Sequence, residues 1–467
     1  MEALKESKPK KDSVLGFMEK VSFFLANAGN IPVMTVLGSF LLLFYTDVVG
    51  LNPVAIGTLF LIARVFDGIS DPVNGYIIDH LPRTKWGRFR PYLFIGALVT
   101  ALNFLLVWMG PALATSGKLV IAYISYILIG WTFDYMDIPL NSMIPVMSDR
   151  DRDRNTLSVI KYVGYLLAGA AFSALALPII SAFPTKREGF FVLIIAATVF
   201  IALFSSLGTL GIKERIFPVK AEKYKIRDLK DIIGAKPVLI FFLETLAYGT
   251  SQGVIGGIGV FFFLYALKRP DLYPLMALSM VVGMIVAVAI GPILIKRFGK
   301  KNMQTWSMGI AILGAAIMFF TPASLPLVFI LIPLIISPAN AVIGILMYSI
   351  QADNMDYVEW KLGYRSEAAV ASLSSFIAKV SVGIGSAVSA YLLPVIHYVP
   401  NAETQAAETV RGFFALNYAI PGALMLIGLL IWAFGYPLTI KVREQMMAEL
   451  VERRKLASGE KPAVNPS

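Results

Sequence analysis

Two apolar segments of the chain carry charged and amide side chains at one spacing. The positions i, i+3 and i+7 are occupied by Arg64, Asp67 and Asp71 in the first segment and by Asp134, Asp137 and Asn141 in the second. In a helix this spacing places the three side chains on one stripe. A charge at the depth of a bilayer is costly unless it faces a partner or a water-filled cavity, so two such stripes predict a polar pathway inside a bundle of membrane-spanning helices, as transport requires.

The composition agrees with a membrane location for these stripes. Apolar residues make up 57% of the 467 residues, charged residues make up 15%, and the mean hydropathy is +0.72. That balance lies outside the range of soluble globular proteins. The sequence contains no cysteine, which rules out disulfides, thiolate metal sites and a cysteine nucleophile. Because it also has no central histidine and no HExxH or GxSxG motif, an intramembrane enzyme is not expected and no cofactor is predicted.

Apolar runs of about 20 residues, the length that crosses a bilayer, occur twelve times in the sequence. They lie near residues 21–46, 53–79, 91–110, 118–146, 157–183, 189–211, 237–267, 273–295, 303–319, 325–350, 368–398 and 411–435. The expected fold is therefore an all-α membrane protein with twelve transmembrane helices in two six-helix halves.

Lysine and arginine are spread unevenly among the loops between these runs. With twelve crossings, both termini lie on one side of the membrane. The loops on the other side contain six of the 41 basic residues, three more lie within spans, and the remaining 32 share the side of the termini. By the positive-inside rule that side is cytoplasmic, which predicts a multi-pass protein of the inner (cytoplasmic) membrane. The net charge of +11 is then a topology signal that needs no nucleic-acid partner.

A long charged linker divides the twelve runs into six and six. The expected parts are a cytoplasmic N-terminal segment, a first half, a central cytoplasmic loop, a second half and a cytoplasmic tail, at residues 1–20, 21–212, 213–236, 237–435 and 436–467. Each half has a glycine-rich basic turn between its second and third runs, at 83–88 and 296–301. Matching turns at matching places predict two structural repeats, the arrangement of the major facilitator superfamily. The alternative is that any polytopic protein places glycine and lysine in cytoplasmic turns.

Several long motifs resemble those of the glycoside-pentoside-hexuronide:cation symporters, a family within that superfamily. They are FYTDVVGL, GTLFLIARVFDGISDP, KWGRFRPY, DYMDIP and ADNMDYVEWKLGYRSE, which begin at residues 44, 57, 85, 134 and 352. The resemblance covers nearly the whole chain in order. It implies symport of a sugar, glycoside or uronate with a monovalent cation, Na⁺ or H⁺, by a protein that works as a monomer through alternating access.

The resemblance implies a cation site at Asp67 and Asp71, with Asp134 standing where the best-known member has a threonine. Carboxylate oxygens suit Na⁺, and two close acids in a low dielectric raise one pKa and so suit a proton equally well. Two structural alternatives stay open. Arg64 could simply neutralise one of the acids of its own helix, and Asp134 could pair with Lys161 or Lys379.

The resemblance also implies the residues that contact substrate, and these are expected to include Arg64 and Lys379. Asp137 matches an acid that accepts sugar hydroxyls, Lys161 stands where an arginine contacts sugar, and Asn141 replaces a tryptophan. Asn27 and Asn30 stand where the family often has Gly-Asp; an amide both donates and accepts, and a packing role for asparagine is the alternative. With the three acids named above and Asp137 ionised against Arg64, Lys161 and Lys379, this polar set is short of one positive charge, which a single Na⁺ or H⁺ would supply.

Two further features are expected to bear on transport. A loop after the tenth run mixes both signs of charge and predicts a cytoplasmic gate made by Asp353, Asp356, Lys361 and Arg365, with a plain solvated loop as the alternative. Glu244 lies within the seventh run, and its role is left open. A lysolipid or other amphiphile carrier of the same superfamily is the second functional hypothesis.

Overall fold

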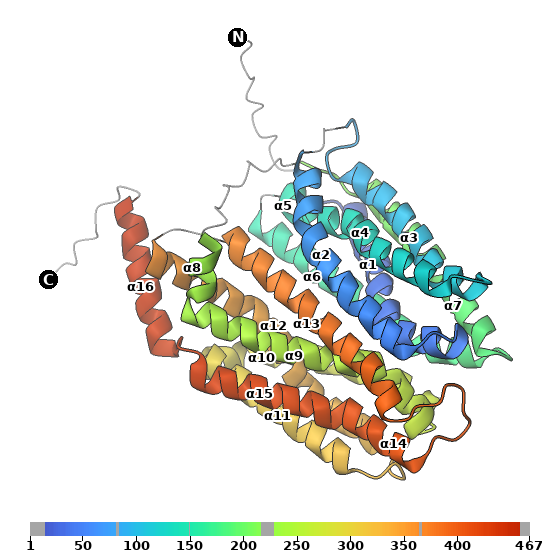
Figure 1. The fold of residues 1–467 in the computed structure, drawn as a ribbon. Helices are drawn as coiled ribbons and strands as arrows, with labels where there is room; N and C mark the ends of the chain where they lie inside the picture. The colour runs from blue at the N-terminus through green and yellow to red at the C-terminus, as the bar shows by residue number, and fades with distance from the viewer. Residues whose placement is uncertain (1–14, 81–83, 149, 216–227, 364–366, 458–467) are drawn as a thin grey trace.

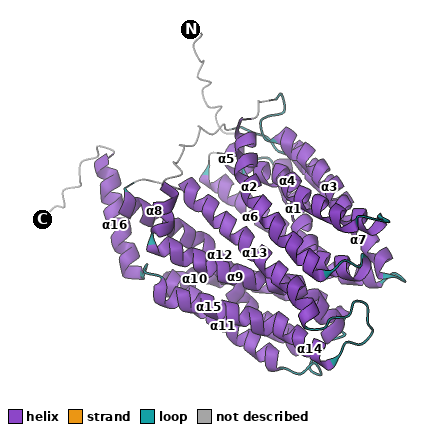
Figure 2. Cartoon of the chain, in the orientation of Figure 1, coloured by secondary structure: helices purple, strands orange, loops and turns teal. Residues whose placement is uncertain are grey.

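The computed structural model describes residues 15–80, 84–148, 150–215, 228–363 and 367–457. Helices make up almost all of this part of the chain, and its only β pairing is an isolated bridge between Thr84 and Gly87 (Figure 2). Among the described residues, eleven helices are long and apolar enough to cross a membrane, and α2, with 28 residues, has the length of a twelfth. At 1.5 Å per residue, α2 is about 42 Å long. The expected all-α membrane fold is confirmed.

The first six long helices and their short companions follow one another from Phe17 to Gly211. They are α1 (Phe17–Leu43), the π-helical turn η1 (Phe44–Val48), α2 (Pro53–His80), α3 (Arg90–Leu113), α4 (Lys118–Asn141), α5 (Met143–Met147), α6 (Asp151–Ser181) and α7 (Lys186–Gly211). We call α1 to α7 the N half.

The second set of helices repeats this order with two additions at its ends. It comprises α8 (Asp228–Gly234), α9 (Lys236–Phe261), η2 (Phe262–Ala266), η3 (Pro270–Leu272), α10 (Tyr273–Phe298), α11 (Lys300–Phe320), α12 (Val328–Leu362), α13 (Glu367–Val395), α14 (Ala407–Phe414), η4 (Ala415–Ala419), α15 (Ile420–Gly435) and α16 (Ile440–Ala457). We call α9 to α15 the C half.

The two halves lie beside each other as separate bundles (Figure 1). Within the N half, α1 packs against α6 and α7, and α3 packs against α4 and α7; within the C half, α9 packs against α13 and α15, and α10 against α12. Three helix pairs join the halves, namely α1 with α9, α2 with α13 and α6 with α10. The charged helix α2 is therefore at the junction between the two bundles.

Two expected boundaries were wrong. The predicted span 118–146 is broken at Ser142, because Pro145 has no N–H to continue the hydrogen-bond ladder, and α5 starts afresh at Met143. The predicted loop after residue 350 is instead the last third of α12, which continues to Leu362 and ends at Gly363 with φ of +77°. This extension is helical because it buries an apolar face, including Val358, against α16.

The first helix of each half ends in a π-helical turn of five residues. The turn η1 has the sequence FYTDV and η2 has FFLYA, and in both the amide of the following residue donates to the carbonyl of the first phenylalanine, at 3.1 Å from Val49 to Phe44 and 2.9 Å from Leu267 to Phe262. Asp47 and Tyr265 are the fourth residues of their turns. A π turn shifts the register of a helix and is often found at functional sites.

The basic turn before α3 is held by an acid from the end of α7. The carboxylate of Glu214 accepts hydrogen bonds from the backbone amides of Arg88, Phe89 and Arg90 at 2.7, 2.8 and 2.9 Å. These amides lead into α3, which begins at Arg90, and at the start of a helix N–H groups have no partner within the helix and a negative charge is favourable. The KWGRFRPY motif therefore has a structural role, because it fixes the start of α3 against α7.

Candidate functional site

The ion pair between Arg64 and Asp67 lies at the junction of the halves. The Arg64 guanidinium donates to Asp67 Oδ2 at 2.8 Å, and both side chains are largely buried. Glycines make the space for this pair, since a Cβ at Gly130 of α4 would collide with the Asp67 carboxylate and a Cβ at Gly383 of α13 would collide with the Arg64 side chain. One glycine comes from each half, so the pair is packed closely against α4 on one side and against α13 on the other.

A cavity of about 280 Å³ opens beside this ion pair. Its walls come from α1, α2 and α4 of the N half and from α9 and α13 of the C half, and they include Arg64, Asp67 and Gln252. We call it the central cavity. The central cavity lies between the halves, and Arg64 and Asp67 of the α2 stripe face it. That it is part of a polar pathway stays a prediction.

Asp134 lies on α4 among side chains of α2 and α13. Asn74 donates to Asp134 Oδ2 at 2.9 Å, Ser70 donates to the same oxygen at 3.4 Å, and Lys379 Nζ is 3.9 Å from Oδ1. Asp134, Ser70 and Asn74 are all buried. The geometry thus supports the alternative in which Asp134 pairs with Lys379, and it also keeps Asp134 against the helix that carries Asp67.

Asp71 falls on α2, one helical turn from Asp67, but its side chain lies outside the described residues. Its expected place in the cation site stays a prediction. We call Arg64, Asp67, Ser70, Asn74, Asp134 and Lys379 the α2 cluster.

Asp137 is the centre of a second group of polar side chains, on α1, α4 and α6. Its Oδ1 accepts hydrogen bonds from Asn30 at 3.2 Å and Tyr165 at 3.4 Å, and its Oδ2 accepts one from Asn141 at 2.7 Å. Lys161 donates to the amide oxygen of Asn141, and its ammonium group lies 5.5 Å from the centre of the Tyr165 ring. We call these five residues the α4 cluster. The structure brings together four residues that the sequence named as substrate contacts.

Asn27 stands apart from that cluster. Its amide nitrogen donates to the carbonyl of Phe23, one turn earlier on α1, at 2.7 Å, and the residue is fully buried. This contact within its own helix agrees with the packing alternative for Asn27, whereas Asn30 donates to Asp137 of another helix. The substrate roles of both residues stay predictions.

Sequence reasoning missed three members of these clusters. Ser70 and Asn74 lie three and seven residues after Asp67 and so continue the stripe on α2, and Tyr165 lies one turn after Lys161 on α6. The same helical spacing that revealed the charged residues would have found them if hydroxyl and amide groups had been included.

A third polar group, also missed, joins the halves at the end of the bundle where α1 and α9 finish. The Asp47 carboxylate contacts Lys186 Nζ at 3.0 Å and accepts hydrogen bonds from Tyr398 at 2.7 Å and from Tyr265. Asn401 donates to the Asp47 carbonyl at 2.7 Å and accepts from Lys186 at 2.9 Å. We call these five residues the far-end cluster.

The far-end cluster connects the two halves at this end of the bundle. The Asp47 side chain is fully buried, and it comes from the N half together with Lys186, whereas Tyr265, Tyr398 and Asn401 come from the C half. Asp47 and Tyr265 occupy equivalent places in the two π turns, so they meet where the repeats face each other. The FYTDVVGL motif contained the signal, because an acid at the end of an apolar helix needs partners.

The predicted gate residues lie at the opposite end of the bundle, on the last turns of α12. Asp353 is buried and pairs with Lys300 at 2.7 Å and Arg443 at 3.0 Å, which belong to α11 and α16. The Lys361 ammonium group lies 3.7 Å from the centre of the Trp360 ring. The pairs of Asp353 connect α12 to α11 and α16 and do not reach the first half, whereas the contact of Lys361 with Trp360 lies within α12. Arg365 lies outside the described residues, Asp356 lies on the same helix face region as Asp353, and the gate stays a prediction.

Glu244 is fully buried on α9, and its Oε1 accepts a hydrogen bond from Gln304 of α11 at 2.9 Å. Its other oxygen has no hydrogen-bond partner among the described residues. Both residues belong to the C half. The residue left undecided by the sequence is therefore packed inside one bundle, away from the Arg64 and Asp67 pair.

Comparison with known proteins gives the chain its family. Residues 22–440 match the family described as MFS/sugar transport protein. The chain is 30% identical to the isoprimeverose transporter of Lactiplantibacillus pentosus, over 94% of this chain and 92% of the relative, and 27% identical to the glucuronide carrier protein homolog of Escherichia coli (strain K12), over 93% and 96%.

The fold is also that of solved transporters. The nucleoside transporter NupG, as its D323A mutant, superposes with a TM-score of 0.64 at 14% identity, over 88% of this chain and 99% of that one. At that identity the likeness speaks for the fold alone. The family match and the two relatives confirm the resemblance that the motifs indicated, and this chain belongs to the MFS sugar transport protein family.

Proposed function

We propose that the protein is a secondary active transporter that couples the movement of a sugar, glycoside or uronate to that of a cation, Na⁺ or H⁺. The observation that carries the proposal is the place of Asp134 and Asp137, three residues apart on α4, in two different clusters. One rigid helix therefore connects an acid of the α2 cluster to the acid at the centre of the α4 cluster. Occupation of one cluster moves the helix that shapes the other, which is the physical requirement for coupling.

The α2 cluster is proposed to hold the cation. It offers carboxylates from Asp67 and Asp134 and the buried amide oxygen of Asn74, which has no hydrogen-bond partner among the described residues. Carboxylate and amide oxygens are ligands for hard cations such as Na⁺, and a carboxylate crowded by another acid also takes up a proton. Asp71 is expected to join them. The coupled ion is a transported substrate, and the two candidates are distinguished by experiment below.

The α4 cluster is proposed to hold the substrate. Asp137 accepts hydrogen bonds, Asn30 and Asn141 offer amides, and Lys161 supplies a positive charge. Such a mixture suits the hydroxyls of a sugar, and the ammonium group also suits the carboxylate of a uronate. Support comes from the relatives, one named for isoprimeverose and the other for glucuronides.

Transport is proposed to proceed by alternating access in a monomer of the inner (cytoplasmic) membrane, with both termini cytoplasmic. In that orientation the far-end cluster is extracellular, and its contacts hold the extracellular side closed around Asp47. Opening to the outside must separate Asp47 and Lys186 from Tyr265, Tyr398 and Asn401. Each hydrogen bond to a charged group that is lost on opening costs about 1.5–3 kcal/mol unless water replaces the partner, so this cluster is proposed to set the balance between the two states.

Uptake by purified protein in liposomes tests the proposal. A panel of radiolabelled sugars and uronates is offered with an inward Na⁺ gradient, an inward pH gradient or no gradient. We expect accumulation above equilibrium for a sugar or uronate under one of the two gradients and only equilibration without a gradient. Inhibition by lysolipid alone, with no effect of any sugar, would instead support the amphiphile carrier.

A further inference from the structure

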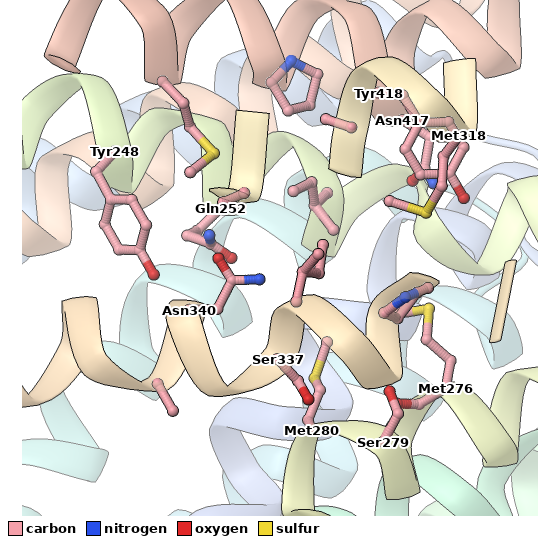
Figure 3. Close-up of a pocket in the computed structure, with 18 of the residues that line it drawn as sticks. Tyr248, Gln252, Met276, Ser279, Met280, Met318, Ser337, Asn340, Asn417 and Tyr418 are labelled. Carbon is pink, nitrogen blue, oxygen red and sulfur yellow. The ribbon is translucent and has the colours of Figure 1, made fainter. Parts of the chain in front are cut away.

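A second cavity of about 280 Å³ lies inside the C half. Its walls come from α9, α10, α11, α12 and α15 together with the π turn η4 (Figure 3). We call it the C-half cavity. None of the residues assigned above to cation or sugar lines it, so it is space that the proposed function has not yet used.

The side chains that line this cavity, all within the described part of the chain, are uncharged. The apolar wall is rich in methionine, with Met276, Met280, Met284, Met318 and Met425. The thioether is flexible and polarisable, and it packs favourably against rings of varied shape. A wall of this kind accepts an apolar group without demanding one exact outline.

A few polar groups face the same cavity and could orient a ligand by hydrogen bonds. In Figure 3, Gln252 of α9 and Asn340 of α12 point toward one another across it. Asn417 also lines it, in the turn η4; this residue is 5% exposed, and its amide oxygen has no hydrogen-bond partner among the described residues. A buried polar atom without a partner is costly in a folded protein, and such an atom at a cavity wall is commonly satisfied by a ligand or water.

The C-half cavity is adjacent to the central cavity. Gln252 lines both, so an occupant of either cavity contacts this side chain. The central cavity carries the charges of Arg64 and Asp67, whereas the C-half cavity is neutral. The α4 cluster adjoins the central cavity, because Met34 of its wall lies one turn after Asn30 on α1. A molecule that reaches from the α4 cluster through the central cavity into the C-half cavity must therefore be polar at one end and largely apolar at the other.

The size of the C-half cavity fits a ring. An apolar cavity of about 150 Å³ in a protein binds benzene, so about 280 Å³ leaves room for a ring with small substituents.

We propose that the C-half cavity binds the neutral, ring-shaped aglycone of a glycoside whose sugar is held by the N half. This inference rests on the proposed function and narrows its substrate class from sugars in general to glycosides with an aryl or similar apolar ring. Gln252 and Asn340 hydrogen-bond to the glycosidic end of the ring or to a hydroxyl on it, and the methionines cover its faces.

Binding to purified protein in nanodiscs, followed by calorimetry, tests this inference with three matched pairs of probes. Each pair is a sugar and its phenyl β-glycoside, made from xylose, glucose and glucuronate. For the sugar that the protein accepts, burial of the phenyl ring is expected to tighten binding by roughly ten- to a hundredfold.

Two neighbouring alanines of α11 provide a blocking variant and its control. Ala315 lines the cavity, whereas Ala316 is exposed on the outside of the bundle and does not line it. Ala315→Leu fills the space, so it should remove the gain from the phenyl group and leave the affinity for the parent sugar unchanged. Ala316→Leu should leave both affinities as in the parent protein.

A second variant, which enlarges the cavity instead of filling it, keeps the inference testable if Ala315→Leu does not fold. Met276→Ala enlarges the cavity and should raise the affinity for a 2-naphthyl glycoside relative to the phenyl glycoside. A phenyl gain that is absent, or that survives Ala315→Leu in a folded protein, overturns the inference while sugar binding upholds the proposed function. If no sugar and no glycoside binds, both are overturned.

Discussion

The two halves share a fold but not a chemistry. In the N half, α2, α4 and α6 bury Arg64, Asp67, Asp134, Asp137 and Lys161 within two connected clusters. In the C half, the corresponding space is a neutral cavity walled by methionines and amides. The bundle geometry that repeats is therefore a scaffold, and the division of charge between its copies decides which half handles ions.

A buried acid on α9 inside the C half departs from this contrast. Glu244 is buried in the C half, and its neighbour is the amide of Gln304, whereas Asp67 in the N half has the guanidinium of Arg64. An acid that meets an amide gains one neutral hydrogen bond, while an acid that meets a guanidinium gains charge compensation as well. The carboxylates of Glu244 and Asp67 therefore differ in their partners, an amide in the C half and a guanidinium in the N half.

The largest effect is expected from Asp67→Asn. It removes a charge that the cation is proposed to balance, so accumulation of sugar against its gradient should be abolished, while exchange of sugar across the membrane persists. Gradient-driven uptake and equilibrium exchange in the same liposomes measure the two. Asp271→Asn, at an exposed acid of the C half, is the control and should accumulate sugar normally. Normal accumulation by Asp67→Asn would end the assignment of the ion to the N half.

Asp137→Ala should act on sugar more than on the ion. Asp137 accepts three hydrogen bonds within the α4 cluster and is proposed to accept others from sugar hydroxyls. Loss of a hydrogen bond to a charged group costs about 1.5–3 kcal/mol, so sugar affinity should fall roughly ten- to a hundredfold. Titration calorimetry with sugar and then with Na⁺ separates the two; weakened Na⁺ binding with intact sugar binding would reverse the roles of the two clusters.

The difference in charge between the halves can also be tested at the far-end cluster, where Tyr265 of the C half donates a hydrogen bond to Asp47 of the N half. Asp47→Asn removes a charge on the N-half side, whereas Tyr265→Phe removes only a hydroxyl on the C-half side. Opening at the far end should therefore rise by about tenfold in the first variant, which weakens the hydrogen bonds from both Tyr265 and Tyr398, and only a few-fold in the second, which removes the Tyr265 hydroxyl alone.

Because the sequence contains no cysteine, a single cysteine at Ser386 in the central cavity reports this opening without background. Its rate of modification by a membrane-impermeant thiol reagent added from outside is the measurement. The same cysteine in the otherwise unchanged protein is the control. Equal rates in all three backgrounds would show that the cluster does not hold the far end closed.

The smallest effect is expected from Glu244→Gln. The hydrogen bond from Gln304 can be kept by an amide oxygen, and among the described residues no cationic side chain pairs with Glu244. Accumulation should stay close to that of the parent protein, and the melting temperature should change by no more than a few degrees, which corresponds to about 1 kcal/mol or less. A severe loss of coupling with normal folding would place an ion site in the C half and remove the contrast between the halves.

Much of the fold could be read from the sequence because the bilayer imposes a strict rule. A segment in the hydrocarbon of a bilayer must form the hydrogen bonds of its backbone N–H and C=O groups within itself, so apolar runs of about 20 residues are helices. The rule weakens where a helix leaves the bilayer. It therefore missed the extension of α12 to Leu362, and it did not see that Pro145 would divide the predicted span 118–146.

The sequence by itself determined which charged residues share a helix face. The stripes Arg64, Asp67 and Asp71, and Asp134, Asp137 and Asn141, follow from helical spacing alone, and a charge in an apolar run already demands a partner. Which partner it finds depends on how separate helices pack. Only the tertiary structure decided that Asp134 faces α2 and Lys379 while Asp137, one turn along, faces α1 and α6.

The same reason explains the far-end cluster and the C-half cavity. No local pattern connects the members of the far-end cluster. Along the chain, Asp47 is 139, 218 and 351 residues from Lys186, Tyr265 and Tyr398, and these residues belong to both halves. The C-half cavity is a space left between five helices, and its shape is set by the volumes of side chains that meet from all of them. Spacing along a chain determines faces, whereas contacts between faces are decided only when the helices are packed.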